Sequence, residues 1–221
     1  MFVGHYGVSF AARRTGVLLP LWVWFLAVQW LDVVFAVLVL AGVEKVRITP
    51  DFTEANSLDL YYMPFTHSLP GSLVLSAIFA AVITMIWNGA RARTFLVVAA
   101  ACFSHWLLDL VVHTHDLPLY DNSAKVGLGL WENVAISFPL ELAVLAVGAW
   151  LYSRSVNLTD RTGRVVIWAF VALMAVAQVF ANFGPALGSP EGFAVSALVG
   201  YAVLAALAAL VERRAVGAHG R

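Results

Sequence analysis

Six apolar stretches, each about as long as a membrane is thick, dominate the sequence. They lie at Val17–Val43, His67–Trp87, Thr94–His115, Glu132–Tyr152, Val165–Leu187 and Phe193–Val211. A helix of about 20 apolar residues crosses the hydrocarbon core of a bilayer. Isolated strands are excluded there, because their backbone polar groups would have no partners. The pattern predicts an all-α integral membrane protein, in which residues 1–221 form a single domain built as a bundle of six transmembrane helices.

The charge content agrees with this fold class. Only 12% of the residues are charged, whereas a soluble domain carries roughly 25%, so the chain has too few charges to cover a soluble surface. The net charge is zero and no basic run is present, which argues against nucleic acid as a partner. The single cysteine, Cys102, excludes an intramolecular disulfide.

Lysine and arginine residues are distributed unevenly between the connections. Ten lie in the N-terminal segment, the second and fourth connections and the C-terminal tail, and three lie in the first and third connections. Positive charge accumulates on the cytoplasmic side of membrane proteins. We therefore expect both termini in the cytoplasm and the first and third connections on the outer side.

Ionisable side chains interrupt several of the apolar stretches. His105, Asp109 and His113 follow one another at four-residue intervals, which places them on one face of a helix, within an arc of about 80°. Asp32 interrupts the first stretch and Glu141 the fourth. Such groups are costly inside a bilayer, so the default expectation is that they serve function.

Two further histidines lie near the ends of apolar stretches. His67 opens the second stretch, and His5 precedes the first. A short re-entrant helix over Phe2–Arg14 would carry His5 to a depth of roughly 13 Å, toward His105 and Asp32. We include this helix in the expected fold.

This collection of histidines and carboxylates has three physical interpretations. Imidazole nitrogen and carboxylate oxygen together suit Zn²⁺, or Fe or Mn, and a cation would offset the cost of burying the carboxylates. The same residues could form a proton or ion relay through the bundle. They could also be paired polar groups that only hold helices together.

Other polar residues have a structural explanation. His115 and Asp116 stand at the end of the third stretch, and we expect them at the membrane interface. Gln178 and Asn182 are one helical turn apart, which favours interhelical hydrogen bonds. The last apolar stretch has few polar residues and is expected to be scaffold.

The segments "FTHSLPGSLVLS" and "SHWLLDLVVH" resemble bacterial inner-membrane proteins known as membrane-bound metal-dependent hydrolases of the YdjM type. The matching residues are His5 in "GHYGVSFAARR", Asp32 in "QWLD", His67 in "THS", and His105 with Asp109. The resemblance covers roughly the first 150 residues and extends distantly to zinc-dependent phospholipases C. A P-D-x-D motif near Asp32 is missing, which leaves the number of metal ions open.

The resemblance and the residue pattern together predict a metal-dependent hydrolase of the bacterial inner membrane. Its substrate would be a lipidic ester or phosphoester, attacked by a metal-activated water, and the metal would be Zn, with Fe or Mn as alternatives. The expected metal ligands are His5, Asp32, His67, His105 and Asp109. Glu141 or His113 would act as general base or acid, or would support a ligand histidine.

Two other functions remain open. An ion- or proton-coupled transporter would use the same residues as a relay. A non-catalytic membrane scaffold would need them only for folding. The exact substrate, the number of metal ions and the oligomeric state are not predicted.

Overall fold

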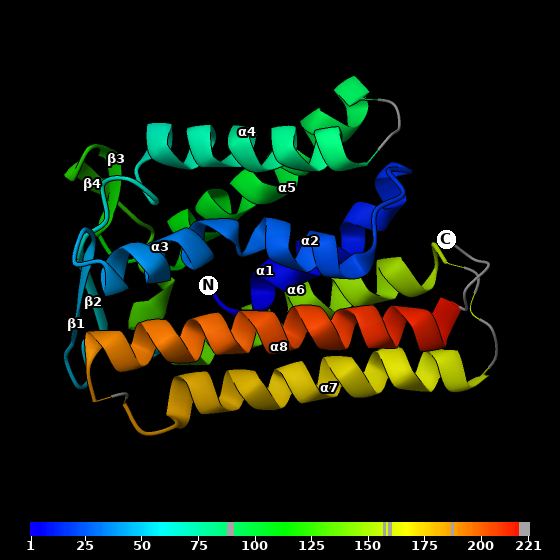
Figure 1. Ribbon diagram of the computed structural model, residues 1–221. Helices are drawn as coiled ribbons and strands as arrows, with labels where there is room; N and C mark the ends of the chain where they lie inside the picture. Colours follow the sequence, from blue (N-terminus) through cyan, green and yellow to red (C-terminus); the bar gives the residue numbers. More distant parts are fainter. Residues whose placement is uncertain (88–90, 157, 159–160, 187, 217–221) are drawn as a thin grey trace.

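The computed structural model describes residues 1–87, 91–156, 158, 161–186 and 188–216. In these ranges the chain forms α1 Val3–Ala11, α2 Leu21–Val28, α3 Trp30–Leu40, α4 Leu69–Ile86, α5 Arg91–Val112, α6 Val134–Ser153, α7 Arg161–Phe183 and α8 Pro190–Val216. Helices α4 to α8 are each long and apolar enough to cross a membrane, and the bent pair α2–α3 can be a sixth span. The prediction of an all-α membrane fold is therefore confirmed (Figure 1).

The first apolar stretch is a broken span rather than one continuous helix. Helices α2 and α3 meet at an angle of 56°. Gln29, between them, has φ −104° and ψ 6°, outside the helical region. Asp32 consequently lies in the first turn of a new helix. Because no proline or glycine marks the break, the sequence does not reveal it.

The other spans agree with the predicted stretches to within a few residues at most of their ends. Helix α7 ends at Phe183, so Pro185 follows the helix and does not kink it. The predicted end of this stretch, Leu187, lies outside the described residues, as does the end of the C-terminal tail.

The expected N-terminal helix is present and lies inside the bundle (Figure 1). Helix α1 packs against α6 with the two backbones in close contact. A Cβ atom at Gly148 would lie 2.0 Å from the carbonyl oxygen of Gly7. Small residues permit such close approach between helices in membranes. A 3₁₀ helix, Ala12–Thr15, follows α1 and carries the first two arginines.

The two connections at the opposite end of the bundle fold into antiparallel hairpins, which the sequence analysis does not predict. Strand β1 (Lys45–Ile48) pairs with β2 (Leu58–Tyr62), and β3 (Leu117–Tyr120) pairs with β4 (Ser123–Val126). Figure 1 shows both hairpins covering this end of the helices. Ile48 of β1 and Leu58 and Leu60 of β2 contribute part of the wall of the cavity described below.

The arginine-rich half of the bundle is filled by aromatic side chains. Tyr6, Phe10, Phe25, Tyr152 and Phe170 are buried in one apolar cluster. Phe10 makes edge contacts with Phe25, Tyr152 and Phe170, at centroid distances of 5.3 to 6.5 Å. The polar residues of the other half are thus separated from this end by close packing.

Candidate metal centre

Asp109 of α5 lies at the centre of a buried group of histidines. Its Oδ1 atom is 3.1 Å from Nε2 of His5. Its Oδ2 atom is 3.0 Å from Nε2 of His105, 3.7 Å from that of His113 and 3.8 Å from that of His67. All five residues are at most 3% exposed. Four histidines therefore converge on one carboxylate. They come from α1, from the segment before α4, from α5 and from the residue directly after α5.

Asp32 provides a second carboxylate beside the first. Its Oδ1 atom lies 3.4 Å from Nε2 of both His67 and His105. Its Oδ2 atom accepts a hydrogen bond of 2.9 Å from the hydroxyl of Tyr201 in α8. The break between α2 and α3 is what places this carboxylate at the start of α3, facing the histidines.

A hydrogen bond from Nδ1, the ring nitrogen that faces away from the carboxylates, fixes the orientation of His105. Its Nδ1 atom lies 2.7 Å from the carbonyl oxygen of Val28, the last residue of α2. Because a carbonyl oxygen only accepts, Nδ1 carries the hydrogen. In a neutral imidazole the Nε2 atom then has a lone pair, which points at the two carboxylates.

His67 is oriented through a chain of hydrogen bonds that ends on a buried carboxylate. The hydroxyl of Thr66 donates to Oε2 of Glu44 at 2.6 Å, and lies 2.8 Å from Nδ1 of His67. Since the single hydroxyl hydrogen is used on Glu44, Nδ1 of His67 donates to Thr66. Glu44 also accepts from the backbone N–H groups of Phe65 and Thr66, at 2.8 and 3.0 Å.

His113 is held in the same way. Its Nδ1 atom lies 2.8 Å from Oδ1 of Asp116, which accepts the hydrogen. Asp116 is 7% exposed, so it is buried inside the protein and bonded to a histidine, and its position at the membrane interface stays a prediction. The tight turn after α5 brings Asp116 back to His113, whereas His115 is exposed.

The two carboxylates in this arrangement call for positive charge beside them, which a protonated imidazole, the Met1 amino group or a bound cation can supply. Three imidazoles donate outward from Nδ1 and direct Nε2 at carboxylate oxygens, so acceptors face acceptors at 3.0 to 3.8 Å. Ligands bound tetrahedrally to one Zn²⁺ lie about 3.3–3.6 Å apart. Ligand histidines in metalloproteins also characteristically donate their other nitrogen to a carboxylate or carbonyl oxygen. The donor set therefore fits a divalent metal.

Two overlapping groups of residues could hold the ion. One is His5, His105 and Asp109, and the other is Asp32, His67 and His105, with the ligand atoms of each group within 4.8 Å of one another. The rings of His5 and His105 are stacked with their centroids 3.8 Å apart. Because His105 belongs to both groups, the geometry accommodates one ion in either position or a pair that shares this region.

Two other polar contacts involve the start of the chain. The amino group of Met1 lies 2.5 Å from Oδ1 of Asp109. Oε2 of Glu141 accepts from the backbone N–H groups of Phe2 and Gly4, at 2.7 and 3.4 Å. These bonds hold the N-terminal end of α1, and thereby His5, in place. The role of Glu141 in acid–base chemistry stays a prediction.

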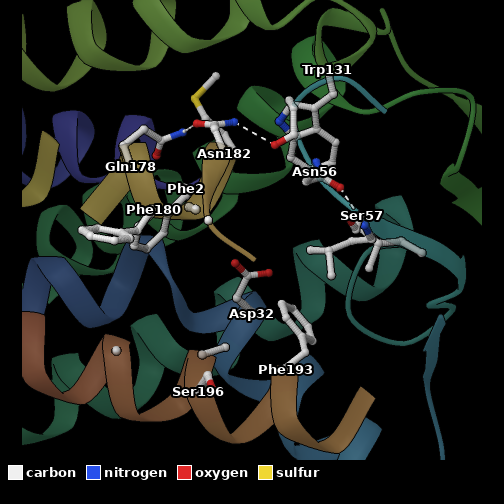
Figure 2. Close-up of a pocket in the computed structure, with 18 of the residues that line it drawn as sticks. Phe2, Asp32, Asn56, Ser57, Trp131, Gln178, Phe180, Asn182, Phe193 and Ser196 are labelled. Carbon is white, nitrogen blue, oxygen red and sulfur yellow. Dashed lines mark hydrogen bonds between the residues drawn. The ribbon is translucent and has the colours of Figure 1, made fainter. Parts of the chain in front are cut away.

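A cavity of about 690 Å³ leads to the candidate centre. Asp32, His67, Asp109 and His113 line its inner end, while His5 and His105 lie behind them. Figure 2 shows Asp32 pointing into the space between residues of α7, α8 and the connection that carries β1 and β2. The cavity gives a substrate access to the two carboxylates.

The polar pair in α7 makes the expected bonds between segments. Gln178 accepts from the backbone of Val3 at 3.2 Å and donates to Asn182 at 2.7 Å. Asn182 in turn donates to the carbonyl oxygen of Ala55 at 2.8 Å. This chain of bonds connects α1, α7 and the connection between β1 and β2 around the cavity.

The sequence analysis does not identify three residues as members of the site: Glu44, Asp116 and Tyr201. Glu44 follows an apolar stretch directly and precedes Lys45, so it resembles an ordinary loop charge. Tyr201 is one of only a few polar residues in the last stretch, and this is the signal that could have identified α8 as more than scaffold.

Comparison with family models, with curated proteins and with solved structures finds no match to this chain. The candidate metal centre is therefore argued from the residues and their geometry.

Proposed function

We propose that this chain is a metal-dependent membrane hydrolase that cleaves a lipidic ester or phosphoester, as the resemblance to the YdjM-type proteins implies. The observation that carries the proposal is the convergence of four histidine Nε2 atoms on the Asp109 carboxylate, with Asp32 beside it. His5, Asp32, His67, His105 and Asp109 are the proposed ligands. Zn²⁺ is the first choice of metal, and Fe or Mn are alternatives.

A bound metal of this kind supplies a water whose pKa is lowered toward about 7 and polarises the scissile group. The protein's own residues would fix the geometry. Glu44, through Thr66, and the carbonyl of Val28 hold His67 and His105 with their Nε2 atoms directed inward. Tyr201 orients Asp32. These contacts preserve the ligand arrangement during turnover.

His113 is the better candidate for the general base. Asp116 accepts from its Nδ1 atom, as the orienting carboxylate of a catalytic triad does. Its Nε2 atom is 3.7 Å from the nearest Asp109 oxygen, beyond hydrogen-bond distance, and the residue lines the cavity. It can therefore receive a proton from a water in the cavity. Glu141 remains the alternative, although the backbone of α1 already occupies one of its oxygens.

The surroundings favour a hydrolase over a relay. A transporter needs a polar path to both membrane faces. The cavity reaches the histidines from the hairpin end of the bundle, while the aromatic cluster around Phe10 fills the arginine-rich half. If the arginine-rich end is cytoplasmic, the site is reached from the outer side of the inner membrane.

The test is hydrolysis by the purified protein in lipid nanodiscs, measured on a panel of phospholipids and neutral glycerides. We expect a chelator to abolish cleavage, Zn²⁺ to restore it, and Asp109→Asn to lack it. Metal-loaded protein that cleaves no lipid on the panel, yet dissipates a proton gradient when reconstituted in liposomes, would overturn the proposal in favour of the transporter.

A further inference from the structure

The cavity in front of the histidines has a mouth between two membrane-spanning helices. Its walls include Phe180 and Ala181 of α7 and Ala197 and Gly200 of α8. In Figure 2, labelled residues of α7 and of α8 lie on opposite sides of Asp32. Phe180 lines the cavity and is nevertheless 70% exposed on the surface of the bundle, so the cavity opens through the side of the protein.

The mouth lies at the level of one bilayer leaflet. At 1.5 Å per residue, the lining residues of α7 from Ala177 onward occupy about the last 9 Å of that helix, and Phe193 to Tyr201 lie about 5–17 Å from the start of α8. Half of the hydrocarbon core is about 15 Å thick. The part of the cavity between α7 and α8 therefore lies within the depth of one leaflet, while Asn56, Ser57 and Pro185 line it at the hairpin end of the bundle.

The two ends of the cavity differ in character. The inner end has the carboxylates of Asp32 and Asp109 and the imidazoles of His67 and His113. The part between α7 and α8 is lined mostly by phenylalanine, alanine and glycine, with Gln178, Asn182 and Ser196 as its polar residues. Its 690 Å³ falls in the range of about 300–1,000 Å³ that is typical of ligand pockets. An apolar channel that ends on polar groups is complementary to an amphiphile.

We propose that the gap between α7 and α8 admits one hydrocarbon chain of a bilayer lipid from the hairpin-side leaflet, with the lipid's polar group at Asp32 and His113. This inference rests on the proposed function for the identity of the polar group. It adds the route of entry, the orientation of the substrate and a requirement for a long chain. Burial of the chain against α7 and α8 supplies binding free energy at a distance from the reacting bond.

Gly200 offers a test that leaves the fold intact. A Cβ atom added there meets no other atom within 4 Å, and Gly200 lines the cavity, so we expect a leucine side chain to extend into the cavity. Leucine also favours a helix more than glycine does. Val199, the residue directly before Gly200, is 57% exposed and does not line the cavity. Val199→Leu is therefore the matched control.

The experiment is a titration of the purified protein in detergent with a long-chain phosphatidylglycerol, followed by native mass spectrometry, with dihexanoyl phosphatidylglycerol as the short-chain probe. We expect Gly200→Leu to weaken long-chain binding by about fiftyfold, the loss for about three methylene groups excluded from the cavity. Val199→Leu should bind like the wild type. Binding of the short-chain probe should be equal in all three proteins.

Equal long-chain affinity in Gly200→Leu and the wild type would overturn the inference, and so would wild-type protein that binds neither probe. Formation of a dimer that Gly200→Leu abolishes would assign the gap to a second copy of the chain and overturn it too. Metal content, measured on the same samples, is a separate readout. Its absence from all three proteins would refute the proposed function, while a chain-length effect would still support the entry route.

Discussion

The hydrogen-bond chain from Glu44 through Thr66 to His67 allows the metal hypothesis to be tested with one nearly isosteric substitution. Thr66→Val replaces the hydroxyl by a methyl group of similar size. It removes the acceptor that lies 2.8 Å from Nδ1 of His67 and the donor that lies 2.6 Å from Oε2 of Glu44. The backbone donors to Oε1 of Glu44 remain, so the surrounding segment keeps its anchors.

Two separate effects are expected from this substitution. Loss of the hydroxyl leaves a buried imidazole N–H and one carboxylate oxygen without their partner, which costs about 1–3 kcal/mol in the free energy of unfolding. Removal of a group that orients a ligand histidine typically lowers metal affinity by about 10- to 100-fold. Thr66→Ser keeps the hydroxyl and should retain wild-type affinity.

The assay is competition between the protein and a chromogenic zinc chelator, with thermal unfolding measured on the same preparations. We expect Thr66→Ser to bind zinc about as tightly as the wild type, and Thr66→Val to bind zinc clearly less tightly than both. If Thr66→Val binds zinc as tightly as Thr66→Ser, then His67 is not a ligand oriented by Glu44, and this part of the reasoning is wrong.

Three other predictions follow from the packing and from the contacts of the site. Gly148→Ala, which places a Cβ atom 2.0 Å from a backbone oxygen of α1, should destabilise the protein by about 1–3 kcal/mol in thermal unfolding, whereas Gly200→Ala should not destabilise it. Tyr201→Phe removes the 2.9 Å hydrogen bond to Asp32 and should weaken zinc binding by about tenfold or more, since bonds to charged groups contribute about 1.5–3 kcal/mol; unchanged affinity would contradict the role of Asp32 as a ligand. His113→Ala should keep its metal while hydrolysis falls by about 10²- to 10⁴-fold, and loss of metal from this variant would instead make His113 a ligand.

The membrane fold could be predicted because length and hydropathy alone determine which segments cross a bilayer. The break at Gln29 could not, because it depends on how α3 packs against its neighbours and no residue in "AVQWLD" disfavours a helix by itself. The hairpins of the first and third connections could not be predicted either. Segments of four or five residues, such as Lys45–Ile48, are too short for a periodic pattern to emerge from the sequence.

The candidate site could be predicted where charge stands out against an apolar background. His105, Asp109 and Asp32 are conspicuous for this reason. In the structure, Nε2 of His105 lies 3.4 Å from a carboxylate oxygen of Asp32 and 3.0 Å from one of Asp109. Glu44 and Asp116 lie just beyond the ends of apolar stretches, where charges are common. Only the turn of the chain after each span shows that they are buried and bonded to histidines.

The central claim is that the converging imidazoles and carboxylates hold a divalent metal, and elemental analysis of the purified protein tests it most directly. Protein isolated without added metal or chelator is measured beside His105→Ala, which removes the residue common to both candidate ligand groups. We expect the wild type to carry at least about one equivalent of Zn, Fe or Mn per chain and the variant to have only background levels. Correctly folded wild-type protein that holds no stoichiometric metal, even after incubation with Zn²⁺, would contradict the account.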